Sequence, residues 1–248
     1  MNIQVALLPN LISAPSELAI IIDTLRFTTT ACQAFKAGAH RLHVASEIDQ
    51  IRTMRDASSR GKAATALCGE RHGHRIDGFD LGNSPHEYTE EAVGEKSLFF
   101  TTTNGTRAIS AAQEIGTTSI WLAAVVNRQT VAQRLLAESP ETVQIICAGT
   151  DGQIALEDVL AAGAIMTAHQ DTGSIMFGDG AAIAAAAWAS YQDRISDAFE
   201  TATGGRNLIE AGYERDLDFA AQVDALDLVP ANSFDAPNCF QCQSAFVA

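Results

Sequence analysis

Several charged residues occur in short polar runs where their spacing could support chemistry. The carboxylates are Asp23, Glu70, Asp80, Glu157 and Asp158, and the arginines are Arg26 and Arg71. Carboxylate oxygens are the ligands that Mg²⁺ prefers, and arginine binds phosphate, sulfonate or carboxylate through two parallel hydrogen bonds. A metal-binding Asp close to an anion-binding Arg, as in Asp23 and Arg26, is expected in phosphoryl transfer. These residue types predict an anion-binding site with a divalent metal ion such as Mg²⁺, whereas each carboxylate taken singly could instead be a helix cap or a salt-bridge partner.

Three expected strands end in a polar run that leads directly into a helix start. The runs are residues 23–30, 101–107 and 147–158. Ligands of open α/β sheets bind outside the carboxyl ends of the strands, where helix N-termini offer free N–H groups to an anion. In a parallel sheet the three runs would lie along one edge and form one site. The alternative is that each run is an ordinary helix cap or turn.

The elements that must position these runs alternate along the first two thirds of the chain. Apolar, β-rich segments at 3–8, 18–22, 41–45, 97–101, 119–123 and 143–147 are typical of strands. Helical composition between them predicts helices at 28–37, 47–59, 106–115 and 127–138. This alternation favours an α/β fold, with helices layered on both sides of a largely parallel or mixed sheet.

The last third of the chain predicts helices without a strong strand, at 156–170, 180–191, 193–202, 206–211 and 217–223. Its acidic residues are most simply explained as solvated surface. Residues 68–85 form the longest stretch without periodicity, and a loop of that length in a compact domain is usually functional. We expect residues 1–248 to form a single α/β domain, or two lobes that divide near residue 150.

Composition excludes several classes of partner. The formal net charge of −14 argues against binding to nucleic acid or to an anionic membrane surface. Pro9 interrupts the apolar segment at 3–8, which predicts neither a signal peptide nor a membrane span. Five cysteines spread over a long chain do not resemble the disulfide framework of a small secreted domain, so a cytoplasmic protein is expected. The sequence leaves open whether the protein forms a homo-oligomer.

Common catalytic motifs are absent from the sequence. There is no Gly-x4-Gly-Lys-Ser/Thr loop and no early Gly-x-Gly-x-x-Gly, which argues against P-loop and dinucleotide sites. Leu25 stands where aspartyl-phosphate phosphatases have a second Asp, and Cys147 lacks the Arg six residues later that a cysteine phosphatase needs. A zinc site of His72, His74, Cys239 and Cys242 is a weaker alternative. Because no nucleophile stands out, direct attack by water is preferred over a phosphoenzyme.

Several of these runs together resemble the 2-phosphosulfolactate phosphatase family. The most specific matches are Gly-Phe-Asp-Leu-Gly-Asn-Ser-Pro at 78–85 and Thr-Thr-Asn-Gly-Thr at 102–106. Shorter matches are Asp-Thr-Leu-Arg-Phe-Thr-Thr-Thr at 23–30, Gly-Glu-Arg at 69–71, Cys-Ala-Gly at 147–149 and Leu-Glu-Asp at 156–158. The resemblance implies an α/β fold unlike that of other phosphatases and Mg²⁺-dependent hydrolysis of 2-phospho-3-sulfolactate to 3-sulfolactate, a step towards coenzyme M. The family extends beyond that pathway, so a related phosphorylated hydroxy acid is an alternative substrate.

The same resemblance assigns expected roles to the motif residues. The metal ligands would come from Asp23, Glu70 and Asp80, and Glu157 or Asp158 would orient or deprotonate the attacking water. Arg26 would face the transferring phosphoryl group, while Arg71 would bind the remote acid groups of the substrate. The other substrate-binding residues would be Asn83, Ser84, Thr102, Thr103, Asn104, Gly105 and Thr106.

Two other kinds of function stay open on the sequence alone. A phosphotransferase or lyase that acts on a small phosphorylated acid would use the same Mg²⁺ and Arg chemistry. A non-catalytic module that binds a small anion is the other alternative. Phosphate release in the absence of any acceptor would separate the phosphatase from both.

Overall fold

A computed structural model describes residues 1–58, 64–170, 178–233 and 235–243. Its strands form one ten-stranded mixed sheet with the order β1-β8-β2-β7-β9-β10-β3-β6-β4-β5. The strands are β1 (Asn2–Ala6), β2 (Leu18–Ile22), β3 (Arg41–Val44), β4 (Thr65–Arg71), β5 (His74–Arg75), β6 (Ser97–Thr101), β7 (Ser119–Ala123), β8 (Thr142–Cys147), β9 (Val229–Ser233) and β10 (Ala236–Gln243). The expected α/β class with a mixed sheet is confirmed.

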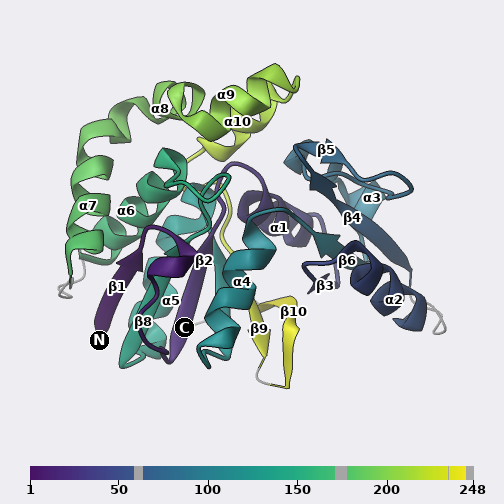
Figure 1. Ribbon diagram of the computed structural model, residues 1–248, viewed down its shortest axis with the longest axis horizontal. Coiled ribbons are helices and arrows are strands. Elements are labelled where there is room, and N and C mark those ends of the chain that lie inside the picture. Colours follow the sequence, from purple (N-terminus) through teal and green to yellow (C-terminus); the bar gives the residue numbers. More distant parts are fainter. Residues whose placement is uncertain (59–63, 171–177, 234, 244–248) are drawn as a thin grey trace.

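Helices follow most of the strands and continue through the last third of the chain (Figure 1). They are α1 (Phe27–Lys36), α2 (Ile48–Ser58), α3 (Glu90–Val93), α4 (Gly105–Glu114), α5 (Arg128–Glu138), α6 (Leu156–Gln170), α7 (Asp179–Tyr191), α8 (Ile195–Thr201), α9 (Thr203–Glu210) and α10 (Glu214–Ala220). None of the described helices is long and apolar enough to cross a bilayer.

The central strands are apolar on both faces because helices cover both faces. In β2, Leu18, Ile20 and Ile22 belong to one hydrophobic core, and Ala19 and Ile21 belong to another on the opposite face. The first core contains side chains of α6 and α7, and the second contains side chains of α1 and α4. Side chains alternate between the faces of a strand, so five consecutive buried residues require a layer on each side.

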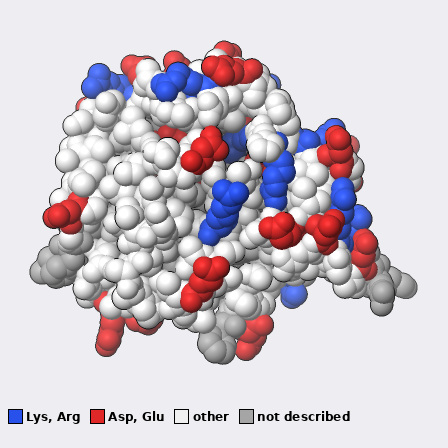
Figure 2. Space-filling view, in the orientation of Figure 1, with Lys and Arg blue, Asp and Glu red and all other residues white. Residues whose placement is uncertain are grey.

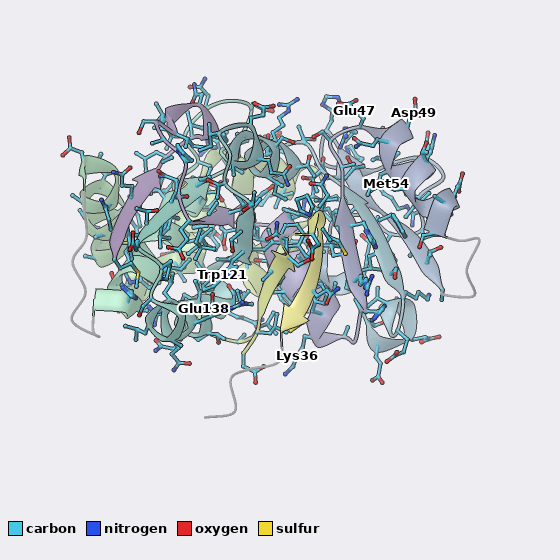
Figure 3. The ribbon with its side chains drawn as sticks, turned by 90° about the horizontal axis from the view of Figure 1, so that it is seen from below. Lys36, Glu47, Asp49, Met54, Trp121 and Glu138 are labelled. Carbon is cyan, nitrogen blue, oxygen red and sulfur yellow. The ribbon has the colours of Figure 1, made fainter. Side chains whose placement is uncertain are left out.

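Two blocks of parallel strands make up most of the sheet. One block is β1-β8-β2-β7 and the other is β3-β6-β4. The hairpin of β9 and β10 lies between them and pairs antiparallel with β7 and with β3. Seen from below, this yellow hairpin separates Trp121 from Met54 (Figure 3). Because three antiparallel steps separate β7 from β3, the strands of the two blocks run in opposite directions.

The expectation of one parallel sheet edge is therefore wrong for the polar run after β6, which belongs to the second block. Strand twist explains how the runs still meet. Five pairing steps separate β2 from β6, and a twist of roughly 20–25° per step turns the second block by roughly 100–125°. In a flat sheet, strands that run in opposite directions have their carboxyl ends at opposite edges. The rotation of the second block removes this separation, so the carboxyl ends of β2 and β6 can lie near the same cavity.

Two stretches of the sequence form strands that were not predicted. Residues 68–85 are not one long loop, because β4 runs to Arg71 and pairs with β5 in a hairpin. Near the C-terminus, β9 and β10 form where no strong strand was expected. Pro230 and the polar residues of this segment weaken a strand prediction, but pairing with β7 and β3 stabilises it.

The surface agrees with the acidic composition. On the face drawn in Figure 2, Lys and Arg side chains stand among Asp and Glu side chains rather than forming a continuous basic surface.

The five cysteines are free thiols, and three of them, Cys32, Cys68 and Cys147, are completely buried.

Candidate active site

A cavity of about 540 Å³ lies where the loops after β2, β6 and β8 meet the β4–β5 hairpin and helix α9. Eight of the residues expected to act in catalysis, metal binding or substrate binding line it: Asp23, Arg26, Glu70, Asn83, Thr103, Asn104, Glu157 and Asp158. The cavity therefore contains most of the candidate site, and both blocks of the sheet contribute to it.

Asp23 lies directly after the buried strand β2 and before helix α1. Its backbone C=O accepts hydrogen bonds from the N–H and the hydroxyl of Thr28, at 3.0 Å each, which fixes the turn into the helix. Its carboxylate accepts the N–H of Gly105 at the start of α4. Burial and the nearby Glu70 carboxylate raise the pKa of Asp23 to about 7, and Arg26 opposes that rise.

Gly105 is needed where α4 approaches Asp23. A Cβ atom at this position would overlap the ring of Phe27 and lie 2.8 Å from Asp23 Oδ2. The absence of a side chain lets the N-terminus of α4 reach the carboxylate. Gly105 therefore contributes close backbone approach and its N–H group, rather than a side chain, to the site.

Glu70 connects the β4–β5 hairpin to the loop after β6. Its Oε1 accepts the N–H of Thr103 at 2.7 Å, and its Oε2 accepts the N–H of Gly73 at 3.0 Å. The side chain is only 6% exposed. Both oxygens thus already hold one hydrogen bond each, and the carboxylate is fixed in position.

Glu157 and Asp158 are neighbours in the first turn of α6, but their carboxylates are held differently. Asp158 accepts the N–H of Thr24 at 2.8 Å and the N–H of Gly149 at 2.9 Å, so it joins the loops after β2 and β8. Glu157 Oε1 accepts a long hydrogen bond of 3.5 Å from the Thr150 hydroxyl, and its buried Oε2 has no hydrogen-bond partner among the described residues. Burial is the largest cause that raises the pKa of each carboxyl group, and Asp23 raises that of Asp158 further.

Arg26 is the cation of the cavity. Its side chain is buried, it donates a hydrogen bond of 3.0 Å to the C=O of Gly73, and its guanidinium lies 4.9 Å from the centre of the Tyr213 ring. Its charge acts directly on Asp23, where it lowers the pKa. These contacts hold the guanidinium beside the carboxylates.

The C-terminal helices contribute residues that the sequence did not predict. Figure 1 shows α8, α9 and α10 passing over the top of the molecule, from α7 toward β5. Asn207 and Glu210 of α9 line the cavity. Asp216 of α10 is buried and accepts a hydrogen bond of 2.6 Å from Ser84 Oγ. The acidic segment is therefore partly a wall of the site, not only solvated surface.

One sequence signal could have indicated this contact. The pair Gly204 and Gly205 lies inside α9, where glycine is unfavourable without a reason of packing. A Cβ atom at Gly204 would overlap Glu157 Oε1. The missing side chain lets α9 pack directly against the catalytic candidate on α6.

Arg71 and Asp80 do not line the cavity. Arg71 donates hydrogen bonds to the C=O groups of Glu70 and Ser46 and to Thr101 Oγ1, at 2.8, 2.5 and 2.9 Å. Neighbouring side chains of a strand point to opposite faces, so Glu70 and Arg71 cannot both face the site. Asp80 is exposed, and its Oδ2 accepts the N–H of Leu67.

Three further motif residues are buried outside the cavity lining and stabilise the segments around it. Thr106 Oγ1 donates to the C=O of Thr102 at 2.7 Å, and the N–H of Thr106 donates to Thr102 Oγ1. These bonds fix the first turn of α4. Ser84 is held by Asp216. Thr102, Ser84 and Thr106 are buried and outside the cavity lining.

The donor set of the cavity is compatible with a Mg²⁺ ion, although the described residues contain no cluster of three His, Cys, Asp or Glu side chains arranged as a ready metal site. Mg²⁺ keeps several waters and commonly uses one or two carboxylates together with substrate phosphate. Mutual repulsion of Asp23 and Glu70, which raises the pKa of Asp23, is what a cation between them would relieve. The unpartnered Oε2 of Glu157 is a further free acceptor.

The alternative zinc site is not assembled in the described part of the chain. His72 and His74 line the cavity, whereas Cys239 lies on β10, with its Sγ 3.9 Å from Nε2 of His43 on β3. Cys242 is on the same strand and is exposed.

The chain is similar to known proteins over most of its length. A family model described as 2-phosphosulpholactate phosphatase matches residues 6–233. A protein of Synechococcus sp. (strain CC9605) is 39% identical over 219 residues, which cover 86% of this chain and 88% of the relative. One of Parasynechococcus marenigrum (strain WH8102) is 38% identical over 220 residues, 88% of this chain and 89% of the relative. One of Microcystis aeruginosa is 35% identical over 216 residues, 86% and 88% of the two chains.

All three relatives are named probable 2-phosphosulfolactate phosphatase. The family model covers nearly the whole chain, including every motif residue of the cavity and the α9–α10 region that closes it. The chain belongs to the 2-phosphosulfolactate phosphatase family.

Proposed function

We propose that the protein is a Mg²⁺-dependent phosphatase that hydrolyses 2-phospho-3-sulfolactate, or a closely related phosphorylated hydroxy acid, to the free hydroxy acid and phosphate. The names of its relatives support the phosphatase reaction and the substrate. The observation that carries the proposal is the meeting of Asp23, Glu70 and Glu157 with Arg26 in one cavity. Buried carboxylates beside a cation suit a site in which a metal ion and an anion bind together.

Asp23 and Glu70 would hold the metal ion, because the charge of Glu70 is the strongest charge effect on Asp23. When bound, Mg²⁺ supplies positive charge that offsets the phosphate and polarises its oxygens. Asp80 lies outside the cavity lining and has no part in the proposed ligand set.

Arg26 would bind the phosphoryl group that is transferred. Its guanidinium is already oriented by Gly73 and Tyr213, so little order has to be gained when the substrate binds. The N-terminus of α4 adds N–H donors on the other side of Asp23, and Thr103 has a buried hydroxyl that lacks a partner among the described residues. These donors would stabilise the extra negative charge of the transition state.

Glu157 would orient the attacking water and accept its proton through the free Oε2. A raised pKa suits a general base, because a proton acceptor works best when its pKa lies close to the operating pH. Asp158 has both oxygens bound to backbone N–H groups, so its proposed part is to position the loops that carry Asp23 and Glu157.

The experiment is an assay of released phosphate, with Mg²⁺ and without any acceptor, across a panel of 2-phosphorylated hydroxy acids that includes 2-phospho-3-sulfolactate. We expect turnover with this substrate, loss of turnover in excess chelator and recovery when Mg²⁺ is added back. Release only when an acceptor is present would indicate a phosphotransferase. Saturable binding without release would indicate an anion-binding module. Full turnover in excess chelator would contradict the metal dependence.

A further inference from the structure

The tip of the β4–β5 hairpin has an unusual residue for its backbone conformation. His72 and Gly73 form the turn, and both have positive φ, 52° and 82°. Two-residue hairpin turns with positive φ at both central positions favour Asn-Gly, Asp-Gly or Gly-Gly. Histidine tolerates positive φ better than most residues, but it is not among the residues that this turn type favours. Residues that hold such a conformation are often found at binding sites.

The backbone N–H and C=O groups of Gly73 attach the hairpin tip to Glu70 and Arg26. The N–H of Gly73 donates to Glu70 Oε2, and the C=O of Gly73 accepts from Arg26. This pair of bonds holds the turn at the cavity, and His72 and His74, one on each side of Gly73, both line it. The backbone that carries both histidines is thus tied to Arg26 and Glu70.

The charges in the cavity do not match a substrate with three acid groups. Six carboxylates line it: Asp23, Glu70, Asp151, Glu157, Asp158 and Glu210. Arg26 is the sole Lys or Arg among the described lining residues, since Arg71 is bound to Ser46 and Thr101 outside the cavity. A metal ion and Arg26 can serve the phosphoryl group, which leaves the remote acid groups without a charged partner. His72 and His74 also line the cavity, and an imidazole offers at least one ring N–H donor to an acid group.

We infer that His72 and His74 form the subsite for the sulfonate of the substrate, an acid group that is not transferred. Ring N–H groups of both imidazoles donate hydrogen bonds to its oxygens. The inference rests on the proposed function for the substrate class. It assigns selectivity between sulfonated and unsulfonated substrates to the hairpin tip and leaves the phosphoryl group to Arg26.

The test replaces the rings while keeping the turn. His72→Asn retains a residue that tolerates positive φ, and His74→Ala removes the second ring from the exposed strand β5. His40→Asn, at an exposed site in the loop before β3, is the matched control. Steady-state kinetics are measured with 2-phospho-3-sulfolactate and with 2-phospholactate, which lacks the sulfonate. Binding of the product 3-sulfolactate is measured by calorimetry, with lactate as its unsulfonated counterpart.

We expect the double variant His72→Asn, His74→Ala to raise KM for the sulfonated substrate about tenfold and to weaken 3-sulfolactate binding about tenfold. Its kcat, and its kinetics with 2-phospholactate, should stay within about twofold of the unmodified protein, as should those of His40→Asn. Equal losses with both substrates would overturn the inference and indicate a structural role for the tip. Unchanged binding of 3-sulfolactate would also overturn it. If no substrate releases phosphate, the proposed function fails, and the calorimetric arm still decides the subsite.

Discussion

The two sides of the cavity come from the two oppositely directed blocks of the sheet, and their carboxylates are held differently. The β2–β8 side consists of Asp23, Glu157 and Asp158, and burial raises the pKa of each. The β4–β6 side consists of Glu70 and Thr103, which are joined by a hydrogen bond of 2.7 Å. One side therefore concentrates poorly compensated negative charge, while the other is fixed by backbone donors.

The carboxylates available for chemistry therefore differ from the carboxylates that hold the site in shape. Buried carboxylates whose pKa values are raised are costly for the fold but available for a metal ion or a proton. A carboxylate with both oxygens bound to backbone N–H groups is fixed in position and shapes the site, and the remaining lone pairs of its oxygens can still face a metal ion, as proposed for Glu70. The same contrast recurs within the β2–β8 side, between Glu157 and Asp158. Four predictions test it, from the largest expected effect to the smallest.

Asp23→Asn should lower kcat/KM by about a thousandfold, roughly 4 kcal/mol of transition-state stabilisation. The amide keeps the shape of the side chain but removes the charge that would bind the metal ion. Without metal, the variant should be at least as stable as the unmodified protein, because burial and Glu70 oppose the charge of Asp23. Phosphate release and thermal unfolding measure the two effects. Substantial activity in the variant would remove Asp23 from the proposed ligands.

Glu157→Gln and Asp158→Asn form a matched pair of neighbours. Glu157→Gln should lower kcat strongly with little change in stability, since Oε2 has no partner to lose among the described residues. Asp158→Asn should lower the free energy of unfolding by about 1–3 kcal/mol, because an amide NH₂ must face a backbone N–H of Thr24 or Gly149. Denaturant unfolding measures the loss of stability expected for Asp158→Asn, and steady-state kinetics measure the loss of kcat expected for Glu157→Gln. The reverse pattern would exchange the roles of the two residues.

The metal-free protein should become less stable as the pH rises from about 4 to about 7. The pKa of Asp23 is raised from 3.8 to about 7, so the folded state binds more protons than the unfolded state in this range. The stabilising proton is present below pH 4 and is lost as the pH passes 7. We expect about 2 kcal/mol, less than the full shift implies, because water entering the cavity beside Asp23 would screen its charge.

Chemical denaturation with and without chelator measures this dependence. Saturating Mg²⁺ should reverse it, because the ion binds the ionised carboxylate. Asp23→Asn should reduce the slope of the metal-free profile between pH 4 and pH 7, and the raised pKa values of Glu157 and Asp158 account for the slope that remains. A profile that stays unchanged in this variant would assign the pH dependence to other groups.

Tyr213→Ala should lower kcat about tenfold, whereas Tyr213→Phe should leave it nearly unchanged. The phenylalanine ring keeps the face on which the Arg26 guanidinium lies, and alanine removes it. A cation–π contact of this kind contributes about 0.5–2 kcal/mol, and tenfold corresponds to about 1.4 kcal/mol. Steady-state kinetics of both variants, with melting temperatures as a control for folding, measure the effect. Loss of activity in Tyr213→Phe would point to the hydroxyl instead of the ring.

Much of the local structure could be predicted from the sequence. The strands at 18–22, 97–101 and 119–123 and the helix at 156–170 have the predicted bounds. Their apolar runs and helix composition are local signals. Asp23, Glu157 and Asp158 were predicted at strand ends and helix starts for the same reason, and the structure brings them together in the cavity.

The position of Arg71 could not be predicted from composition or spacing. Glu70 and Arg71 are adjacent charged residues, and either could face the ligand in a loop. Once 65–71 forms a strand, pleating forces one to each face, and pairing with β6 decides which. The glycine and charged residues at the end of this segment have low strand propensity, so the strand was not predicted from the sequence.

The amino-acid sequence by itself determined the α/β class, most helices and strands, and the residue types of the site. The tertiary structure alone decided that the two blocks run in opposite directions, that β9 and β10 join them, that Tyr213 packs on Arg26 and that Asp216 binds Ser84. Periodicity and capping act between residues close in the chain. Strand pairing and helix packing depend on contacts such as Ser84 to Asp216, 132 residues apart, which no local pattern encodes.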